Sequence, residues 1–535
     1  MAFSCIVRLM VFLGLAVSAT AQTILLTPNT TVLSATGGNV IFTATFSYTT
    51  LPSTLGITIN LPTGWSYVSG TTVPGTSPAE PAVAPSAGRT GQLEWAFITP
   101  PASPATFTFT TAYPGTATGL QALTPTTIAR DTAGSPATTV TAPAYNLSAP
   151  SNIVTWSGVT GSWTDPTQWT SSTVPANSGA TRFSATVAAG VASLNTAVTI
   201  DNLTFTGGVI NGTGNLGLSG LGSTWTGGTF GGASELVIGA GAQFTASGAS
   251  VHLFNDRTIR NEGTFSWVDQ GALQSGNGGA FINSAGAKFT DATTGGGNAL
   301  ISNSGTGSFS FTNAGTYSKT AASTTVISVP FSNTGNILIS AGTVRFSSTF
   351  TQTGGLLDVA TGATARFDTP LAFAAGTLRG GGTVVADITN SAFISPGNTL
   401  GTLTINGNLT LLGTSHLQFD IAGTSQGTNY DYLAVSGTAT LGGNFTFTMA
   451  LGAENLIGGG ATLTLLSSSA LSGAFVGIPN GTRLLASSGT GSFILNYGPT
   501  SVTLSGFQPI PEPSIWALLL AGVGAVAVAT VRRRR

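Results

Sequence analysis

Short phrases that begin with asparagine and contain glycine recur in the second half of the chain. They are "NEGTF" at Asn261, "NSAGAKF" at Asn283, "NAGTY" at Asn313 and "NTGNI" at Asn333, separated by 22, 30 and 20 residues. This period is close to one coil of a parallel β-helix, in which each coil buries its inward residues only by stacking on the next. Because Asn and Gly tolerate positive φ, we expect them at the corners between strands.

The composition around these phrases favours β-structure. Charged residues make up only 6% of the 535 residues, against about 25% in a typical soluble domain. Stretches such as "SAGTVRF", "TGATARF" and "AAGTLRG" combine Gly with strand-forming Thr, Val, Leu and Phe. We therefore predict an all-β chain with an elongated right-handed parallel β-helix (β-solenoid) over residues 197–450 and a further β region over 451–508.

Residues 22–150 have a different pattern. Alternating stretches such as "VIFTATFSY" and "ATFTFTTAY" are separated by turns rich in Pro and Gly. This pattern predicts a β-sandwich of immunoglobulin-like size, with Trp65 and Trp95 as core aromatics.

A Trp-rich junction, residues 151–196, follows with Trp156, Trp163 and Trp169 close together. We favour a hydrophobic cap over the first coil, which would cover an open strand edge. The alternative is a row of exposed rings that contacts a glycan.

The two ends carry targeting features. Residues 1–21 have Arg8, an apolar run and small residues at Ala19 and Ala21, which predict a secretory signal peptide cleaved after Ala21 and export by the Sec machinery. Cys5 is the only cysteine and would be removed with this signal. The mature chain would then have no disulfide, thiolate metal site or cysteine nucleophile.

The last 27 residues, 509–535, combine a Pro-Glu-Pro motif, an apolar run and a basic cluster. Residues 515–531 are uncharged, and a helix of that length spans about 25 Å at ~1.5 Å per residue, enough for a short transmembrane helix. The basic cluster would stay on the cytoplasmic side by the positive-inside rule. The residues concerned are Pro511, Glu512, Pro513, Arg532, Arg533, Arg534 and Arg535.

This order resembles the PEP-CTERM sorting signal of bacterial exported proteins. The resemblance implies recognition by an exosortase-type membrane protease, cleavage near Pro-Glu-Pro and release or transfer to the cell surface. It also implies an exopolysaccharide or biofilm setting. The alternative is a single-pass membrane anchor that is never processed.

Two further segments resemble bacterial surface proteins. Residues 387–447, from Asp387 to Phe447, resemble the C-terminal passenger region of autotransporters and related β-helices. The Trp-rich junction resembles an entry motif of surface proteins that carry β-solenoids.

One polar cluster suggests an enzyme. Two carboxylates on adjacent coils beside an arginine could neutralise and deprotonate a uronic acid, as in a polysaccharide lyase. Equally, strand alternation could turn the same residues outward as a solvated face. The cluster comprises His252, Asp256, Arg257, Arg260, Glu262 and Asp269.

Other motifs predict turns rather than sites. "GTGNLG" (212–217) resembles a dinucleotide-binding loop and "GTSQG" (423–427) a nucleophile elbow with Ser425, His416 and Asp420, but neither precedes a helical segment. His252 and His416 are the only histidines, so we expect no zinc site, and we assign no metal ligands and no cofactor. Calcium binding by isolated Asp side chains and carbonyls stays an open alternative.

The charge pattern argues against a nucleic-acid partner. Leaving out Arg8 and the four terminal arginines leaves 11 of the 16 basic residues, and leaving out Glu512 leaves 16 of the 17 acidic ones, a net charge of about −5. No basic stripe is available to bind phosphates.

The sequence thus favours a non-enzymatic structural or adhesive protein of the bacterial envelope or extracellular matrix, with exopolysaccharide as the expected partner. The alternatives are a β-helix polysaccharide lyase or glycosidase, and a carbohydrate-binding surface protein.

Overall fold

The computed structural model describes residues 22–510 except 31–32, 35, 71–80, 118, 131–133, 135, 150, 180 and 295–298. The predicted signal peptide and the predicted helix 515–531 lie outside the described residues. The chain divides into two compact units, Met1–Ser151 and Asn152–Arg535. The described part is all-β, apart from the short 3-10 helices η1 (Pro166–Gln168), η2 (Thr170–Ser172) and η3 (Ala453–Asn455). Within that part, no helix has the length and apolarity needed to cross a membrane.

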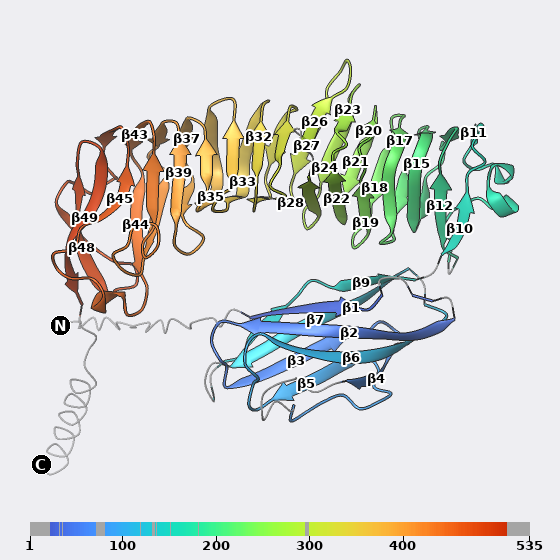
Figure 1. Ribbon diagram of the computed structural model, residues 1–535, viewed down its shortest axis with the longest axis horizontal. Helices are drawn as coiled ribbons and strands as arrows, with labels where there is room; N and C mark the ends of the chain where they lie inside the picture. The colour runs from blue at the N-terminus through green and yellow to red at the C-terminus, as the bar shows by residue number, and fades with distance from the viewer. Residues whose placement is uncertain are drawn as a thin grey trace, which may run out of the picture. The chain divides into compact units, whose positions relative to one another are not determined.

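The first unit consists of two antiparallel sheets around one core (Figure 1). Its alternating sequence places every second side chain inside, as in β6, and Trp65 and Trp95 are buried as predicted. One sheet has the order β1 (Gln22–Pro28), β2 (Gly37–Tyr48), β6 (Ala105–Pro114), β4 (Ser66–Gly70). The other has the order β5 (Gln92–Phe97), β3 (Thr54–Asn60), β7 (Leu120–Arg130), β8 (Thr138–Thr141), and β9 (Tyr145–Ser148) also pairs with β7.

The second unit is one continuous path of 40 strands among the described residues. They are β10 (Asn152–Thr155), β11 (Thr160–Ser162), β12 (Phe183–Val187), β13 (Val191–Ser193), β14 (Val198–Ile200), β15 (Asn202–Asn211), β16 (Leu216–Leu218), β17 (Ser223–Phe230), β18 (Glu235–Ile238), β19 (Gln243–Ala246), β20 (His252–Phe254), β21 (Thr258–Asn261), β22 (Thr264–Asp269), β23 (Leu273–Ser275), β24 (Ala280–Asn283), β25 (Lys288–Thr293), β26 (Ala299–Asn303), β27 (Ser310–Asn313), β28 (Thr316–Lys319), β29 (Thr324–Ile327), β30 (Phe331–Asn333), β31 (Asn336–Ile339), β32 (Thr343–Phe346), β33 (Phe350–Val359), β34 (Thr364–Phe367), β35 (Leu371–Gly380), β36 (Thr383–Val385), β37 (Ile388–Asn390), β38 (Phe393–Pro396), β39 (Thr402–Asn406), β40 (Leu409–Leu411), β41 (His416–Ile421), β42 (Tyr432–Val435), β43 (Thr438–Leu441), β44 (Asn444–Met449), β45 (Leu463–Ser467), β46 (Ala470–Gly473), β47 (Thr482–Leu485), β48 (Gly491–Tyr497) and β49 (Ser501–Pro509).

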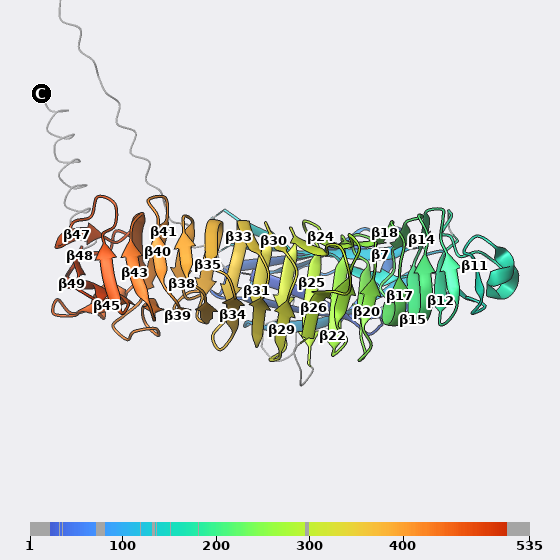
Figure 2. The same cartoon turned by 90° about the horizontal axis from the view of Figure 1, so that it is seen from above.

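Most of these strands pair in parallel with a strand two or three further along the chain. For example, β21 pairs with β24, β24 with β27 and β27 with β30. Where strands three apart are paired, three consecutive strands form one coil, and a long strand such as β33 takes the place of two because it pairs with both β30 and β31. The coils stack side by side along the unit (Figure 2). Parallel pairing begins at β10–β12, inside the predicted Trp-rich cap (151–196). It extends to β43–β46, beyond residue 450, where the predicted β-helix ends. The last strands, β47 to β49, pair antiparallel.

Inside the stack, equivalent aromatic residues lie on one another. The rings of Phe281, Phe311 and Phe331 stack with centroid distances of 4.8 Å at both steps and interplanar angles of 11° and 12°. Each ring is buried. This spacing equals the distance between paired strands, because each coil adds one ring to the row.

The recurring asparagines form a buried hydrogen-bonded row rather than the predicted corners of positive φ. Asn261 donates to Asn283 Oδ1 (2.8 Å), Asn283 to Asn313 Oδ1 (2.7 Å), and Asn313 to Asn333 Oδ1 (2.6 Å). All four are fully buried and end strands in register, and none has positive φ. Pairing between coils, not backbone conformation, therefore explains the repeat.

Asn313→Ala tests this row. Its amide accepts a hydrogen bond from Asn283 and donates to Asn333 Oδ1 and to the Asn336 carbonyl (3.0 Å), so the substitution leaves buried polar groups without partners. We expect the free energy of unfolding to fall by about 2–3 kcal/mol. Urea unfolding of residues 22–510, followed by tryptophan fluorescence, measures this change.

The exposed Asn336 provides the matched control. Asn336→Ala should change the free energy of unfolding by less than about 0.5 kcal/mol. Equal effects of the two substitutions would show that the buried row contributes nothing specific.

Candidate functional site

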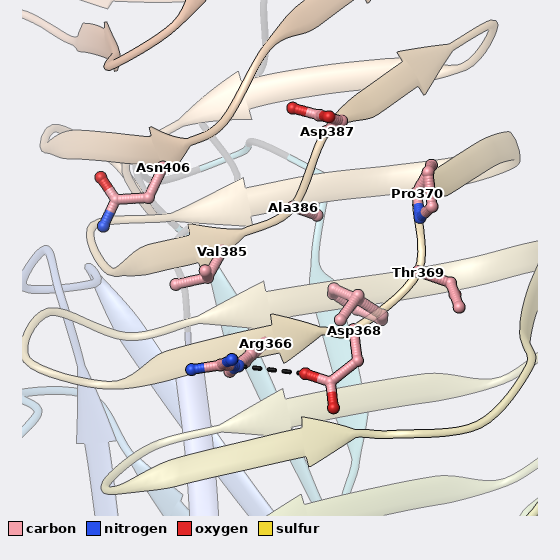
Figure 3. A pocket seen from close by; sticks show the side chains of 9 residues that line it. Arg366, Asp368, Thr369, Pro370, Val385, Ala386, Asp387 and Asn406 are labelled. Atoms are coloured by element: carbon pink, nitrogen blue, oxygen red, sulfur yellow. Dashed lines mark hydrogen bonds and ion pairs between the residues drawn. The ribbon is translucent and has the colours of Figure 1, made fainter.

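The second unit has a surface pocket of about 400 Å³ formed across neighbouring coils (Figure 3). Strands β34, β36 and β39 place Arg366, Val385 and Asn406 next to one another, because these residues are paired in the parallel register. Phe367, the last residue of β34, also lines the pocket, and the connections after β34 and β36 supply Asp368, Thr369, Pro370, Ala386 and Asp387.

Asp368 and Arg366 at this pocket take part in ion pairs, whereas Asp387 is hydrogen-bonded to an uncharged residue. Asp368 lies 2.6 Å from Arg345 Nη2 and 3.1 Å from Arg366 Nε. The hydrogen bond from Arg345 is the largest cause of a lowered pKa for Asp368, so this carboxylate stays ionised. Asp387 accepts hydrogen bonds from the backbone N–H (2.7 Å) and side-chain amide (3.0 Å) of Asn408.

This arrangement suits hydrogen bonding better than acid–base catalysis. A general acid needs a raised pKa near the working pH, whereas the pKa of Asp368 is lowered. The pocket lining contains no His, Lys or Cys. The exposed guanidinium of Arg366 and amide of Asn406 provide hydrogen-bond donors and an acceptor for a polar ligand such as a sugar hydroxyl.

Another surface feature is an exposed aromatic ring. Phe393 on β38 is 51% exposed and stacks on His416 of β41, with ring centroids 5.0 Å apart and an interplanar angle of 27°. These residues are paired in register, and His416 Nε2 lies 2.8 Å from Thr446 Oγ1 on β44. An apolar ring face beside polar groups can pack against the C–H face of a sugar while its hydroxyls form hydrogen bonds.

The polar cluster predicted from the sequence does not gather at one surface. His252 and Arg257 are fully buried. His252 Nε2 lies 2.9 Å from the Trp225 carbonyl, and burial lowers its pKa. Arg257 donates to the Gly231 carbonyl, and burial lowers its pKa to about 10.

The other members of that cluster are a turn residue (Asp256), a strand-end residue (Asp269), an ion-paired arginine and an exposed glutamate. Asp256 and Asp269 have φ values of 62° and 66°, and Asp269 accepts a hydrogen bond from the Gly248 N–H. Arg260 forms an ion pair with Glu235 at 2.6 Å, and Glu262 is exposed. Among the described residues, no three His, Cys, Asp or Glu side chains are grouped closely enough to hold a metal ion.

The three tryptophans of the junction are core residues. Trp156, Trp163 and Trp169 are 4%, 0% and 3% exposed. Trp169 packs edge-on against both others, at centroid distances of 5.0 and 4.7 Å. Their burial removes the ring faces that the glycan-contact hypothesis requires, since each is covered by protein.

The two glycine motifs lie in turns. Residues 212–217 run from a turn into the strand β16 (Leu216–Leu218) rather than into a helix, so no helix N-terminus is available there for a pyrophosphate. Ser425 lies in an exposed turn in which its carbonyl accepts hydrogen bonds from Thr428 and Asn429. His416 bonds to Thr446, so these motifs do not form a nucleophile elbow.

A buried ionic network between coils was not predicted from the sequence. Lys319 on β28 lies 3.1 Å from Asp291 on β25, and both side chains are fully buried. Tyr317 and Thr325 donate to Asp291 Oδ2 at 2.7 and 2.6 Å, and Lys319 also donates to Thr293 (3.0 Å). All these groups face the interior, so the network is structural.

Asp431 is a buried carboxyl with unusual titration. It is fully buried and accepts hydrogen bonds from the N–H groups of Gly401 (2.9 Å) and Asp420 (2.8 Å). Burial raises its pKa to about 7, with a smaller contribution from the neighbouring Asp420 carboxylate. The burial of Asp431 follows no periodic pattern in the sequence. It depends on the turn over residues 422–430, which brings Tyr430 back beside Ile421.

The comparisons with known proteins address the C-terminal segment. Residues 509–535 match the model of the PEP-CTERM protein-sorting motif. The chain carries a PEP-CTERM sorting signal. The match confirms the predicted family resemblance of this segment, and it marks the chain as an exported protein sorted by an exosortase, with a membrane-anchored precursor processed for the cell surface. The search of curated proteins gave no match.

The raised pKa of Asp431 predicts that the free energy of unfolding depends on pH. Between about pH 4 and pH 7 the folded chain holds a proton on Asp431 that the unfolded chain has released. The free energy of unfolding should therefore decrease as the pH rises through this window. Thermal unfolding at pH 5 and pH 8 measures the decrease, which should be smaller in Asp431→Asn.

The exposed Asp256 supplies a control for this experiment. Asp256→Asn should keep the wild-type pH dependence, since Asn also accepts the positive φ found there. If Asp431→Asn also kept it, the proton uptake would have to be assigned to another group.

Proposed function

We propose that this PEP-CTERM chain is a non-enzymatic structural or adhesive protein of the bacterial envelope. In this proposal the second unit is a right-handed parallel β-helix, displayed outside the cell together with the β-sandwich. The observation that carries the proposal is the parallel pairing from β10 to β46 on a chain that ends in a sorting motif. A long stack with a closed interior provides a stiff body with a large, repetitive surface.

The surface chemistry supports a binding role. Charged residues make up 6% of the chain, and the exposed positions of the second unit are mostly Ser, Thr, Asn and Gly. The Ser, Thr and Asn side chains form hydrogen bonds that salt screens little. The residues expected to act in a lyase do not support catalysis, because His252 and Arg257 are inside and Arg260 is paired with Glu235.

The proposed route begins with Sec-dependent export directed by residues 1–21. The apolar segment 515–531 then holds the precursor in the membrane until the exosortase acts near Pro511-Glu512-Pro513. The processed body would join the cell surface or an extracellular matrix of exopolysaccharide, as the family resemblance implies.

Intact-mass analysis of the mature protein tests this route. In wild type we expect the C-terminus to lie near Glu512, in both surface and medium fractions. Pro511→Ala/Glu512→Ala should retain Arg535, because the protease no longer recognises its motif. Retention of Arg535 by both proteins would instead indicate a permanent anchor.

A second candidate function is carbohydrate binding, which the exposed ring of Phe393 favours. Aromatic stacking on a sugar needs an accessible ring face with polar groups beside it. Phe393 offers this face, with His416 and Thr446 on the next two coils.

Phe393→Ala should weaken binding to neutral polysaccharide by roughly 5- to 10-fold, which corresponds to about 1–1.4 kcal/mol of lost stacking. Affinity gel electrophoresis with a panel of neutral and acidic glycans measures this change. Val251→Ala, at another exposed apolar position of the same unit, is the matched control. Equal retardation of the two variants would exclude Phe393 as a contact.

A further inference from the structure

Two leucines are exposed on one loop near the C-terminal end of the second unit. Leu451 is 89% exposed and Leu456 is 69% exposed. Both lie between β44 and β45, where the sequence is "ALGAENLIGGGA" (450–461). Isolated exposed leucines are common on protein surfaces. Exposure alone therefore does not indicate a binding surface, and the inference depends on where these two leucines lie in the fold.

The loop is held in place rather than free. Ala453 and Ile457 from the same loop are 1% and 4% exposed and belong to the core of the unit. Gly452, with φ of 87°, makes the turn into η3. The buried side chains of Ala453 and Ile457 anchor the loop. Leu451 and Leu456 are exposed and face away from the core.

This loop lies beside the point where the described chain ends. Ser488, in the turn between β47 and β48, bonds to the Met449 N–H (3.3 Å) just before the loop. In the same turn, the Thr490 carbonyl accepts a hydrogen bond from Ile510 (3.0 Å). A Cβ on Gly459 would lie 3.6 Å from the Phe507 carbonyl. Figure 1 shows β44, β48 and β49 together at one end of this unit.

The remaining chain before the apolar segment is short. Five residue steps from Ile510 to Ile515 span at most about 18 Å, at ~3.3–3.6 Å per residue. A bilayer adds roughly 5–8 Å of headgroup region on each side of its hydrocarbon core. An anchored precursor therefore keeps Ile510, which is itself 44% exposed, close to the membrane surface.

We propose that Leu451 and Leu456 form a membrane-docking surface that contacts the outer face of the lipid bilayer while the precursor is anchored. Glu454 is the only charged residue of the loop, and one of its carboxylate oxygens is buried. The loop thus presents apolar side chains beside the tether, which is the chemistry of an interfacial contact. Docking would orient the body and hold Pro511-Glu512-Pro513 at the level of the membrane surface. This inference rests on the anchored precursor of the sorting route.

Fluorescence quenching by lipid tests the contact in the full chain. In a Cys5→Ser background, Leu451→Cys and Leu456→Cys carry an environment-sensitive fluorophore, and Val251→Cys, also an exposed apolar position, is the control. The precursor is reconstituted in phosphatidylethanolamine/phosphatidylglycerol vesicles with nitroxide-labelled lipid. We expect strong quenching at the two leucine positions and little at the control.

Vesicle flotation, measured in parallel, tests the membrane anchor separately from the docking surface. If the chain floats with the vesicles but all three probes are quenched equally, docking is overturned while the anchor stands. If the chain does not float, both the anchor and the docking surface are overturned. Protection of the leucine probes in a lipid-free dimer would assign this surface to a second copy of the chain.

A second readout uses unlabelled protein in cells. Leu451→Ser/Leu456→Ser should slow conversion of precursor to processed body several-fold, whereas Val251→Ser should not. An unchanged rate in the double variant would overturn the proposed orienting role of the loop.

Discussion

The parallel register between coils is the constraint on which the second unit depends. In a parallel ladder, a residue in one coil lies directly beside its equivalent in the next coil. The side chains of these two residues therefore contact each other. Phe281, Phe311 and Phe331 can stack because they share a register position. The same constraint lets inward asparagines of adjacent coils form hydrogen bonds with one another, as Asn283 does with Asn313.

This constraint also explains the buried charges and the tight glycine positions. Lys319 and Asp291 are paired in register on adjacent coils, so the ion pair and its hydroxyl partners are satisfied together. A shift by one residue would leave two unpaired buried charges, which would be strongly destabilising. At Gly355, with φ of 68°, a Cβ would overlap the Gly335 carbonyl of the preceding coil.

Sequence reasoning was most successful where a signal repeats locally. The period of the Asn phrases indicated stacked coils, and alternation in residues 22–150 indicated two sheets with Trp65 and Trp95 inside. The reason assigned to the asparagines was wrong, since it considered φ within one coil rather than pairing between coils. Long-range register also hid the pocket, which brings Arg366, Val385 and Asn406 together from positions about 20 residues apart. Phe393 did leave a signal: it adjoins the buried Ile394, and alternation forces one of two consecutive apolar residues outward.

The end of the stack and the sorting signal are joined in a way that preserves the fold during processing. A parallel ladder has an open last edge, and unpaired edges promote association with other chains. Here the antiparallel strands β47 to β49 follow the last parallel pairing, and β49 also pairs with β45. Because β49 ends at Pro509, cleavage near Pro511-Glu512-Pro513 would remove no described strand. The released body would therefore keep the strands that close its edge, and only its tie to the membrane would be lost.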